Sequence, residues 1–293
     1  MGLVTAKEVA KAINLDKYGF LGTFIGWVLM KVTKISSINQ FYDQHKHLDG
    51  LAFLDAILDH YEIKFEIPEE DFKRLPKQGC YITISNHPLG GIDGVLLLKL
   101  LLNHRSDFKI IANFLLNRIE PMSPYILPVN PFETHKDAKS SISGFKSAMK
   151  HLQDGHPLGI FPAGEVSTYR DGKLIVDKPW EEAALKLIRR AEVPVVPIYF
   201  HAKNSRLFYR LSKISDVFRT AKLPSEVTTQ KNRIIKVRIG QPISVQTQNE
   251  QENLAEFADL LRRKTYMLSN AYEKERLLDQ IPTSLKIPKA PRK

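Results

Sequence analysis

The strongest constraint on this chain is the alternation of short apolar runs with longer segments of helical periodicity. Apolar runs with strand character occupy 64–67, 81–85, 108–112, 157–161, 195–200 and 234–240. Segments with helical spacing or composition lie at 93–103, 139–153, 179–190 and 250–276. This order predicts an α/β fold with a single mixed sheet, helices on both faces, and a binding crevice at the carboxyl ends of the strands.

Two helices carry clear local signals. Asp49 can cap a helix that runs to about Tyr61. In 139–153 the apolar positions recur at i, i+3, i+7 and i+10, as Ile142, Phe145, Met149 and Leu152. The stretch around 121–131 is predicted to be a loop between a strand and the second of these helices.

The N-terminal part contains an apolar segment, 18–30, that is flanked by Lys17, Lys31 and Lys34. It holds 13 residues, whereas a spanning helix needs about 20. Aromatic residues between lysines suit the membrane interface, and a core helix fits the same pattern equally well. A signal peptide is rejected because lysines stand where a small-residue cleavage site belongs. Ala6 likewise excludes the myristoylation motif.

The chain shows no repeat, low-complexity block or Gly/Ser linker. We therefore predict an N-terminal helical, membrane-associating segment at 1–61, one α/β domain at 62–276 and a basic tail at 277–293. The tail carries Lys286, Lys289, Arg292 and Lys293, which either attract an anionic membrane or form a solvated end.

The charge balance restricts the possible partners. A formal net charge of +11 favours nucleic acid or an anionic membrane surface, because both present dense phosphates. Nucleic-acid binding has only this charge in its favour, since the sequence lacks zinc spacing, an arginine-rich arm and an aromatic RNA-binding signature. The single cysteine, Cys80, excludes an internal disulfide and a multi-thiolate zinc site, and fits a reducing compartment.

Polar and glycine residues follow the apolar run 81–85 in the sequence NHPLGGIDG, at 86–94. His87 and Asp93 are the candidate catalytic residues. Two glycines between them let the loop fold back, so that the Asp93 carboxylate accepts one imidazole N–H and leaves the other ring nitrogen to take a proton from a hydroxyl. Asp93 is also placed to cap the helix that follows, and the two roles are compatible.

A second polar cluster, GIFPAGEVS at 159–167, ends another apolar run, and VPVVPI follows at 193–198. Taken alone, the Pro-x-Gly of the second cluster indicates a turn. The three motifs, at 86–94, 159–167 and 193–198, occur together in an order and at a spacing that resemble the glycerolphosphate acyltransferase superfamily. Enzymes of that superfamily acylate lysophosphatidate and related lysolipids. The resemblance covers about 64–244.

The resemblance implies roles for individual residues. His87 is the general base, and Asp93 is the carboxylate that orients it. Pro197 is a structural proline, and Asn130 and Lys136 stand in the place of the family's second block. Substrate-binding positions follow from the first and third blocks: Asn86, Gly90, Gly91, Phe161, Pro162, Gly164, Glu165 and Ser167.

Two departures from the family pattern bear on the acceptor. Five residues rather than four separate His87 from Asp93. The family's Phe-Pro-Glu-Gly-Thr-Arg-Ser block here has Glu165 after the glycine and Val166 in place of the arginine that is linked to the acceptor phosphate. This variant pair looks most like the lyso-ornithine, or hemolysin-like, branch. Arg170 lies close enough in sequence to replace the arginine, which leaves 1-acylglycerol-3-phosphate acylation as the alternative.

The resemblance implies an O-acyltransferase of membrane lipid biosynthesis that moves a fatty acyl group from acyl carrier protein or coenzyme A to a lysolipid hydroxyl. We expect direct transfer without a metal or cofactor, because a thioester is already activated and no G-x-S-x-G elbow occurs. The expected partners are the membrane lipid surface, the acyl donor and the lysolipid acceptor, and not nucleic acid. We expect a peripheral protein on the cytoplasmic face of the inner membrane.

Overall fold

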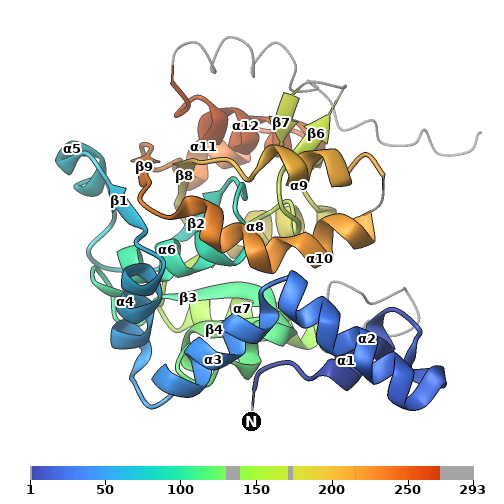
Figure 1. The fold of residues 1–293 in the computed structure, drawn as a ribbon. Helices are drawn as coiled ribbons and strands as arrows, with labels where there is room; N and C mark the ends of the chain where they lie inside the picture. The colour runs from blue at the N-terminus through green and yellow to red at the C-terminus, as the bar shows by residue number, and fades with distance from the viewer. Residues whose placement is uncertain (1, 130–138, 171–173, 215, 271–293) are drawn as a thin grey trace, which may run out of the picture. The chain divides into compact units, whose positions relative to one another are not determined.

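The computed structural model describes residues 2–129, 139–170, 174–214 and 216–270. Its main feature is a seven-stranded sheet in the order β1-β9-β8-β2-β5-β3-β4 (Figure 1). The strands are β1 (Lys64–Glu66), β2 (Ile82–Ser85), β3 (Lys109–Asn113), β4 (Ile126–Val129), β5 (Leu158–Ile160), β8 (Val195–His201) and β9 (Ile234–Ile239). Only the pair β8 and β9 is antiparallel among these strands, so the sheet is mixed, as the sequence predicts.

Helices cover both faces of this sheet. On one face α7 (Lys139–Gln153), α8 (Glu182–Ala191) and α12 (Leu254–Tyr266) share a core with Ile82 and Ile84 of β2. On the other face α6 (Gly91–Leu102) lies close to the sheet, because a Cβ at Gly159 would stand only 3.1 Å from a Leu97 methyl group. The α/β class and the two-sided covering are therefore confirmed.

The central strand β2 has the composition that this position requires. All four of its residues are buried, since it pairs with β5 on one side and β8 on the other and helices cover both of its faces. Burial on both faces explains why the apolar run 81–85 stands out in the sequence. The carboxyl end of this strand is where the polar residues begin.

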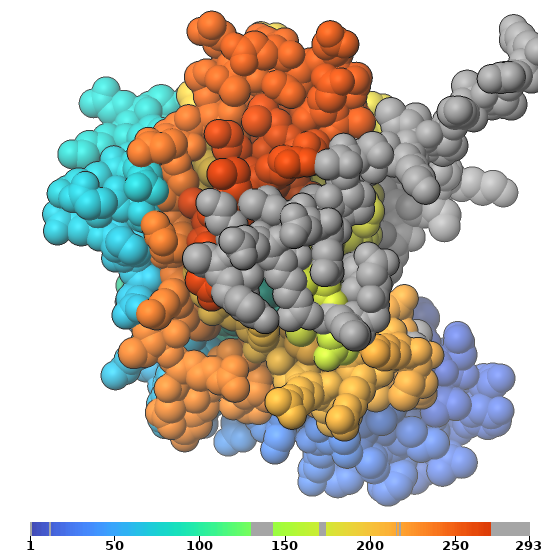
Figure 2. All heavy atoms as spheres, turned by 90° about the horizontal axis from the view of Figure 1, so that it is seen from above, coloured from blue at the N-terminus to red at the C-terminus, as the bar shows by residue number. Residues whose placement is uncertain are grey.

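The chain divides into two compact units. The helical unit comprises Met1–Ile63, Leu115–Pro124 and Asn204–Arg233, and the sheet unit comprises Lys64–Phe114, Tyr125–Lys203 and Ile234–Lys293. All seven strands of the large sheet belong to the sheet unit. Within that unit the C-terminal helices α11 (Val245–Asn249) and α12 form an orange-red group of atoms on one face (Figure 2).

The helical unit consists of six helices and short 3-10 turns within its described residues. The helices are α1 (Ala6–Ala12), α2 (Gly19–Val32), α3 (Ile35–His45), α4 (Gly50–His60), α9 (Arg206–Leu211) and α10 (Asp216–Glu226). The turns η1 (Asp16–Tyr18) and η4 (Val227–Gln230) belong to it, and η2 (Phe114–Arg118) and η3 (Ser123–Tyr125) lie at the ends of its middle segment. The predicted N-terminal helical segment is therefore present, and Asp49 caps α4 by accepting a hydrogen bond from the N–H of Ala52 at 3.0 Å.

Helix α2 packs on α1 through small residues and turns large ones outward. A Cβ at Gly22 or Gly26 would overlap the carbonyl oxygens of Leu15 and Ala6, so glycine permits this close approach. The exposed large residues of the segment are Tyr18, Phe20, Leu21, Phe24, Trp27, Val28 and Val32, with Phe20 at 88% exposure. Among the described residues no single helix is long and apolar enough to cross a membrane; 16–32 and 35–45 meet that requirement only together, across a 77° bend.

The structure also differs from the sequence expectations. Strand β4 lies inside the stretch expected to be a loop, and it is an edge strand, where Pro128 is tolerated because one side needs no ladder hydrogen bond. A second, two-stranded sheet forms from β6 (Thr168–Arg170) and β7 (Leu174–Val176). A short helix, α5 (Glu69–Phe72), follows β1.

Two predicted helices have different limits in the structure. Helix α8 begins at Glu182 rather than residue 179, because residue 179 lies in a bend and the N-cap, Glu181, has extended backbone angles. Helix α12 begins after Asn253, whose side chain accepts hydrogen bonds from the N–H groups of Ala255 and Glu256. It ends at Tyr266, and the predicted extension beyond residue 270 and the basic tail lie outside the described residues.

Candidate active site

The two polar clusters of the sequence meet at one edge of the sheet. Strands β2 and β5 are parallel neighbours, so their carboxyl ends lie side by side. The loop after β2 carries His87, and the loop after β5 carries Phe161 and Ser167. The His87 and Phe161 ring centroids are 4.4 Å apart, and the Ser167 N–H donates to the His87 carbonyl oxygen at 2.8 Å. This edge therefore gathers side chains from segments far apart in the chain.

His87 and Asp93 form a direct pair. The His87 Nδ1 lies 3.0 Å from the Asp93 Oδ2, with the imidazole 18% exposed and the carboxylate fully buried. With the proton on Nδ1 donated to Asp93, the Nε2 lone pair is left to accept a proton. The pair thus has the geometry of a general base with its orienting carboxylate.

The Asp93 carboxylate also shapes the loop that holds it. Its Oδ2 accepts hydrogen bonds from the N–H groups of Leu89 at 2.7 Å and Gly90 at 3.0 Å, at the start of α6. Gly90 has φ of 78°, a region that glycine enters without strain, and this turn accommodates the extra residue between His87 and Asp93. Helix capping and orientation of the imidazole are performed by the same oxygen.

Burial dominates the electrostatics of Asp93. Removal from water raises the pKa of its carboxyl, while the hydrogen bond from His87 and those from the two backbone N–H groups act in the opposite direction. The hydrogen bonds to this carboxyl therefore favour the ionised form that burial disfavours. An imidazolium formed at His87 would be stabilised by the same carboxylate.

The other predicted positions have distinct surroundings. Asn86 is 3% exposed and its amide exchanges two hydrogen bonds with the main chain of Phe200, which ties β2 to β8. Gly91 is exposed at the first position of α6. Glu165 lies 4.0 Å from Lys178, which also pairs with Glu181.

The turn between Phe161 and Ser167 is built around two of the predicted residues. Pro162 is buried, and its carbonyl oxygen accepts the N–H of Glu181 at 2.8 Å. Gly164 has φ of 65°, and its N–H donates a hydrogen bond to the carbonyl oxygen of Phe161 at 3.0 Å. Asn130 and Lys136 lie outside the described residues, as does the side chain of Arg170, which is the last residue of β6.

Asp177 is the site residue that the sequence did not reveal. It follows β7 and is 1% exposed. Its Oδ1 accepts the Ser167 hydroxyl at 2.6 Å and the His87 backbone N–H at 3.2 Å. In the sequence, Asp177 is a single acidic residue that follows the apolar residues Leu174 and Val176. No local pattern connects it to His87.

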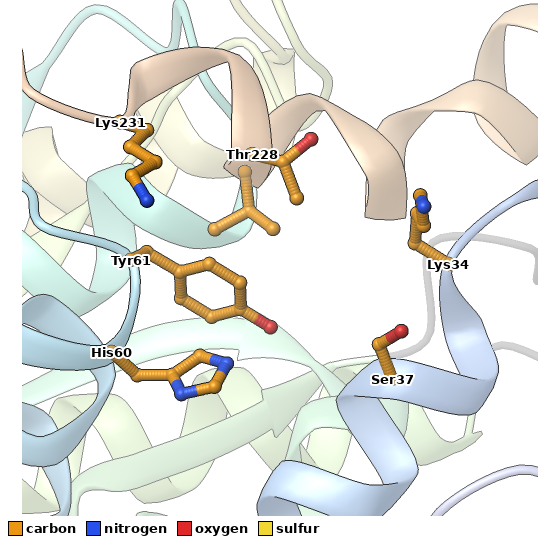
Figure 3. A pocket seen from close by; sticks show the side chains of 7 residues that line it. Lys34, Ser37, His60, Tyr61, Thr228 and Lys231 are labelled. Atoms are coloured by element: carbon orange, nitrogen blue, oxygen red, sulfur yellow. The ribbon is translucent and has the colours of Figure 1, made fainter.

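A separate cavity of about 260 Å³ lies within the helical unit (Figure 3). The Tyr61 hydroxyl points into it in Figure 3, and its lining comprises Lys34, Ser37, His60, Tyr61, Val227, Thr228 and Lys231. His60 makes an edge contact with the Tyr61 ring, at a centroid distance of 4.7 Å. None of the residues predicted for chemistry lines this cavity, so the His87 edge remains the candidate active site.

Comparisons with known proteins identify the family of this chain. A family model described as acyltransferase matches residues 8–275. The chain is 29% identical over 273 residues to a lyso-glycine lipid O-acyltransferase of Bacteroides thetaiotaomicron, covering 91% of this chain and 97% of that protein. It is 28% identical over 275 residues to a lyso-glycine lipid O-acyltransferase of Phocaeicola vulgatus, covering 91% and 95%.

A solved structure is also similar. The crystal structure of the 1-acyl-sn-glycerophosphate (LPA) acyltransferase PlsC from Thermotoga maritima aligns with a TM-score of 0.46 at 15% identity, and covers 94% of this chain and 96% of that one.

Proposed function

The chain belongs to the acyltransferase family, and from that premise we propose that it transfers a fatty acyl group from an acyl thioester to the hydroxyl of a lysolipid. The observation that carries this proposal is the His87 and Asp93 pair at the carboxyl end of β2. The imidazole, which is 18% exposed, provides a base for a hydroxyl, and the buried carboxylate stabilises the resulting cation.

The proposed reaction is a single displacement. As the acceptor hydroxyl oxygen bonds to the thioester carbonyl carbon, its proton passes to Nε2 of His87. The C–S bond then breaks, and the imidazolium returns the proton to the leaving thiolate. Proton transfer by a positioned histidine contributes on the order of 10²–10⁴-fold to such a rate.

The proposed acceptor is a lyso-aminolipid, and a glycine head group is favoured over the ornithine head group that the sequence motifs suggest. Both similar proteins named above are lyso-glycine lipid O-acyltransferases. Val166, which stands where the resemblance expects a phosphate-binding arginine, is 8% exposed in a packed environment. A buried valine supplies no cation for a phosphate, which supports an acceptor without one.

The proposed acyl donor is acyl carrier protein or acyl-coenzyme A. Both carry the acyl group as a thioester, and both are anionic, which suits a chain with a formal net charge of +11. Thioester chemistry and the single cysteine support a site facing the reducing cytoplasm.

We propose peripheral binding to the cytoplasmic face of the inner membrane through α2. Phe20, Phe24 and Trp27 are exposed on this helix, at 88%, 50% and 45%. The Lys31 ammonium lies 4.0 Å from the centroid of the Trp27 ring. Exposed aromatic side chains beside lysines match the boundary between acyl chains and anionic head groups.

A substrate panel tests the acceptor and the donor together. Purified protein is incubated with lyso-glycine lipid, lyso-ornithine lipid or lysophosphatidate, each with acyl-coenzyme A and with acyl carrier protein. We expect O-acylation of the lyso-glycine lipid at the highest kcat/KM. Preferential acylation of lysophosphatidate would instead support the phosphatidate-forming alternative, and inactivity with all three would reject the proposed acceptor class.

Vesicle sedimentation tests the membrane proposal. Phe20→Asp combined with Phe24→Asp is expected to move the protein from the pellet of anionic vesicles to the supernatant, because both changes remove exposed apolar surface. Leu207→Asp, at another exposed position of the helical unit, is the matched control. Equal sedimentation of all variants would contradict docking through α2.

A further inference from the structure

The main chain of His87 is held as firmly as its side chain. Its N–H donates to the Asp177 Oδ1 at 3.2 Å, and its carbonyl oxygen accepts the Ser167 N–H at 2.8 Å. Both bonds come from residues that flank the antiparallel strands β6 and β7, since Ser167 precedes β6 and Asp177 follows β7. The position of the imidazole therefore depends on a segment at least eighty residues away in the sequence.

Asp177 is the point at which these bonds meet. Its Oδ1 accepts from the Ser167 hydroxyl at 2.6 Å as well as from His87, and its Oδ2 accepts from the Trp180 indole N–H at 3.4 Å. The carboxylate is 1% exposed, and Ser167 and Trp180 are each 3% exposed. Charge-assisted hydrogen bonds in such surroundings are strong and directional.

Helix α12 fixes Asp177 from the other side. The Tyr266 hydroxyl accepts the Asp177 N–H at 3.0 Å, and the Arg262 guanidinium donates to the Asp177 carbonyl oxygen at 2.7 Å. Tyr266 is 1% exposed and packs with Leu174, Val176 and Tyr199. The contacts thus run without interruption from a packed helix, through Asp177, to the backbone of His87.

We infer that Asp177 is a positioning residue for acyl transfer, which holds the His87 backbone and the Ser167 loop in register so that Nε2 meets the acceptor hydroxyl. This inference rests on the proposed role of His87 as the base. Asp93 sets the proton affinity and rotation of the imidazole, whereas Asp177 sets the place from which that imidazole acts. Displacement of a reacting group by about 1 Å costs up to about 10²-fold in rate.

The test compares Asp177→Asn and Asp177→Ala with the wild type. Asparagine keeps an oxygen that accepts from His87 and Ser167, so we expect kcat to fall about 10-fold for Asp177→Asn and about 10²-fold for Asp177→Ala. Because Asp177 touches no substrate in this account, the KM for the acceptor should stay within about threefold.

Asp71→Asn is the matched control for structural damage. Asp71 belongs to the same unit, is 2% exposed, and is bound by Arg238, Arg74 and the N–H of Ile239, without a contact to His87. At an equal loss of Tm, we expect Asp71→Asn to keep the wild-type kcat and the kcat of Asp177→Asn to fall about 10-fold. A loss of kcat that tracks Tm in both variants would overturn the inference, as would an unchanged kcat in folded Asp177→Ala.

A third arm separates this inference from the proposed function. In a His87→Ala background, Asp177→Asn should cause no further loss of kcat, because its effect passes through His87. If His87→Ala keeps the wild-type rate, the proposed function fails. If His87→Ala is inactive while folded Asp177 variants retain kcat, only the positioning role fails.

Discussion

The two segments that hold His87 differ in how far they lie from it in the chain. The segment from Asn86 to Asp93 contains the histidine, and the carboxylate of Asp93 binds the imidazole. The segment from Ser167 to Asp177 is distant, and its carboxylate binds the backbone N–H of the same residue. Under the proposed mechanism, Asp93 controls the proton affinity of the imidazole from a neighbouring position in the chain, whereas Asp177 controls the place of the imidazole through tertiary structure.

Asp93→Asn tests the local half of this comparison and has the largest expected effect. Asparagine can still accept from the N–H groups of Leu89 and Gly90, so α6 should keep its start. The amide oxygen that takes the place of Oδ2 carries no charge, so it does not stabilise an imidazolium at His87. We expect kcat to fall at least about 10²-fold.

The measurement is kcat as a function of pH, with the far-UV spectrum as a check of folding. A folded Asp93→Asn variant with kcat within about threefold of wild type would show that Asp93 is only a helix cap.

Ser167→Ala tests the contribution of the distant segment, and we expect a smaller effect than for Asp93→Asn. It removes the 2.6 Å hydrogen bond to Asp177 but keeps the Ser167 N–H that binds the His87 carbonyl. Loss of a buried hydrogen bond to a charged group should lower the free energy of unfolding by about 1–3 kcal/mol. Urea denaturation measures this change, and Ser143→Ala, at an exposed position of α7, is the control. Equal stability of the two variants would show that the buried bond contributes nothing.

Gly164→Ala probes the turn that presents Ser167. Gly164 has φ of 65°, and a Cβ there would lie 3.4 Å from the Glu181 side chain, so space is adequate and backbone conformation is the main cost. We expect a loss of about 1 kcal/mol in unfolding free energy. Gly91→Ala is the control, because a Cβ at Gly91 would have no atom within 4 Å and because Gly91 is part of helix α6, whose backbone conformation alanine adopts. A larger loss at Gly91 than at Gly164 would contradict this explanation.

The smallest expected effect is a change in the pH dependence of stability on substitution of Asp107, which lies in neither segment. The hydrogen bond from Arg105, with a further one from His156, lowers the pKa of the Asp107 carboxyl from 3.8 to about 2. A lowered folded-state pKa stabilises the protein above the unfolded value, and that stability is lost as the pH falls toward 2. Asp107→Asn should therefore lose less stability than wild type between these pH values. The measurement is the free energy of unfolding as a function of pH for both proteins. The same pH dependence in wild type and Asp107→Asn would contradict a lowered pKa of Asp107.

Sequence patterns identified the parts of the fold that depend on neighbours in the chain. The α7 helix was predicted with its observed limits, because Phe145, Met149 and Leu152 recur at helical spacing. His87 and Asp93 were recognisable because they lie six positions apart in one short polar and glycine-rich stretch, 86–94. The buried run of β2 was equally clear, since helices cover it on both faces.

Long-range pairing explains what the sequence did not reveal. Among the described strands β4 pairs only with β3, and the β6 and β7 strands have three residues each, too few for a clear periodic signal. Asp177 gains its partners from His87, Ser167 and α12, none of which a local pattern indicates. Likewise, 204–233 joins 1–63 in one compact unit through tertiary contacts alone.

Acyl transfer by folded His87→Ala tests the central claim most directly. Cys80 precedes β2 and His87 follows it, so the one cysteine and the proposed base stand at opposite ends of that strand. We expect wild-type protein to form O-acylated lyso-glycine lipid from acyl thioester, and His87→Ala to be slower by about 10²–10⁴-fold at unchanged Tm. A near wild-type rate in the variant, or a stable acyl adduct on the enzyme during turnover, would contradict direct transfer with His87 as the base.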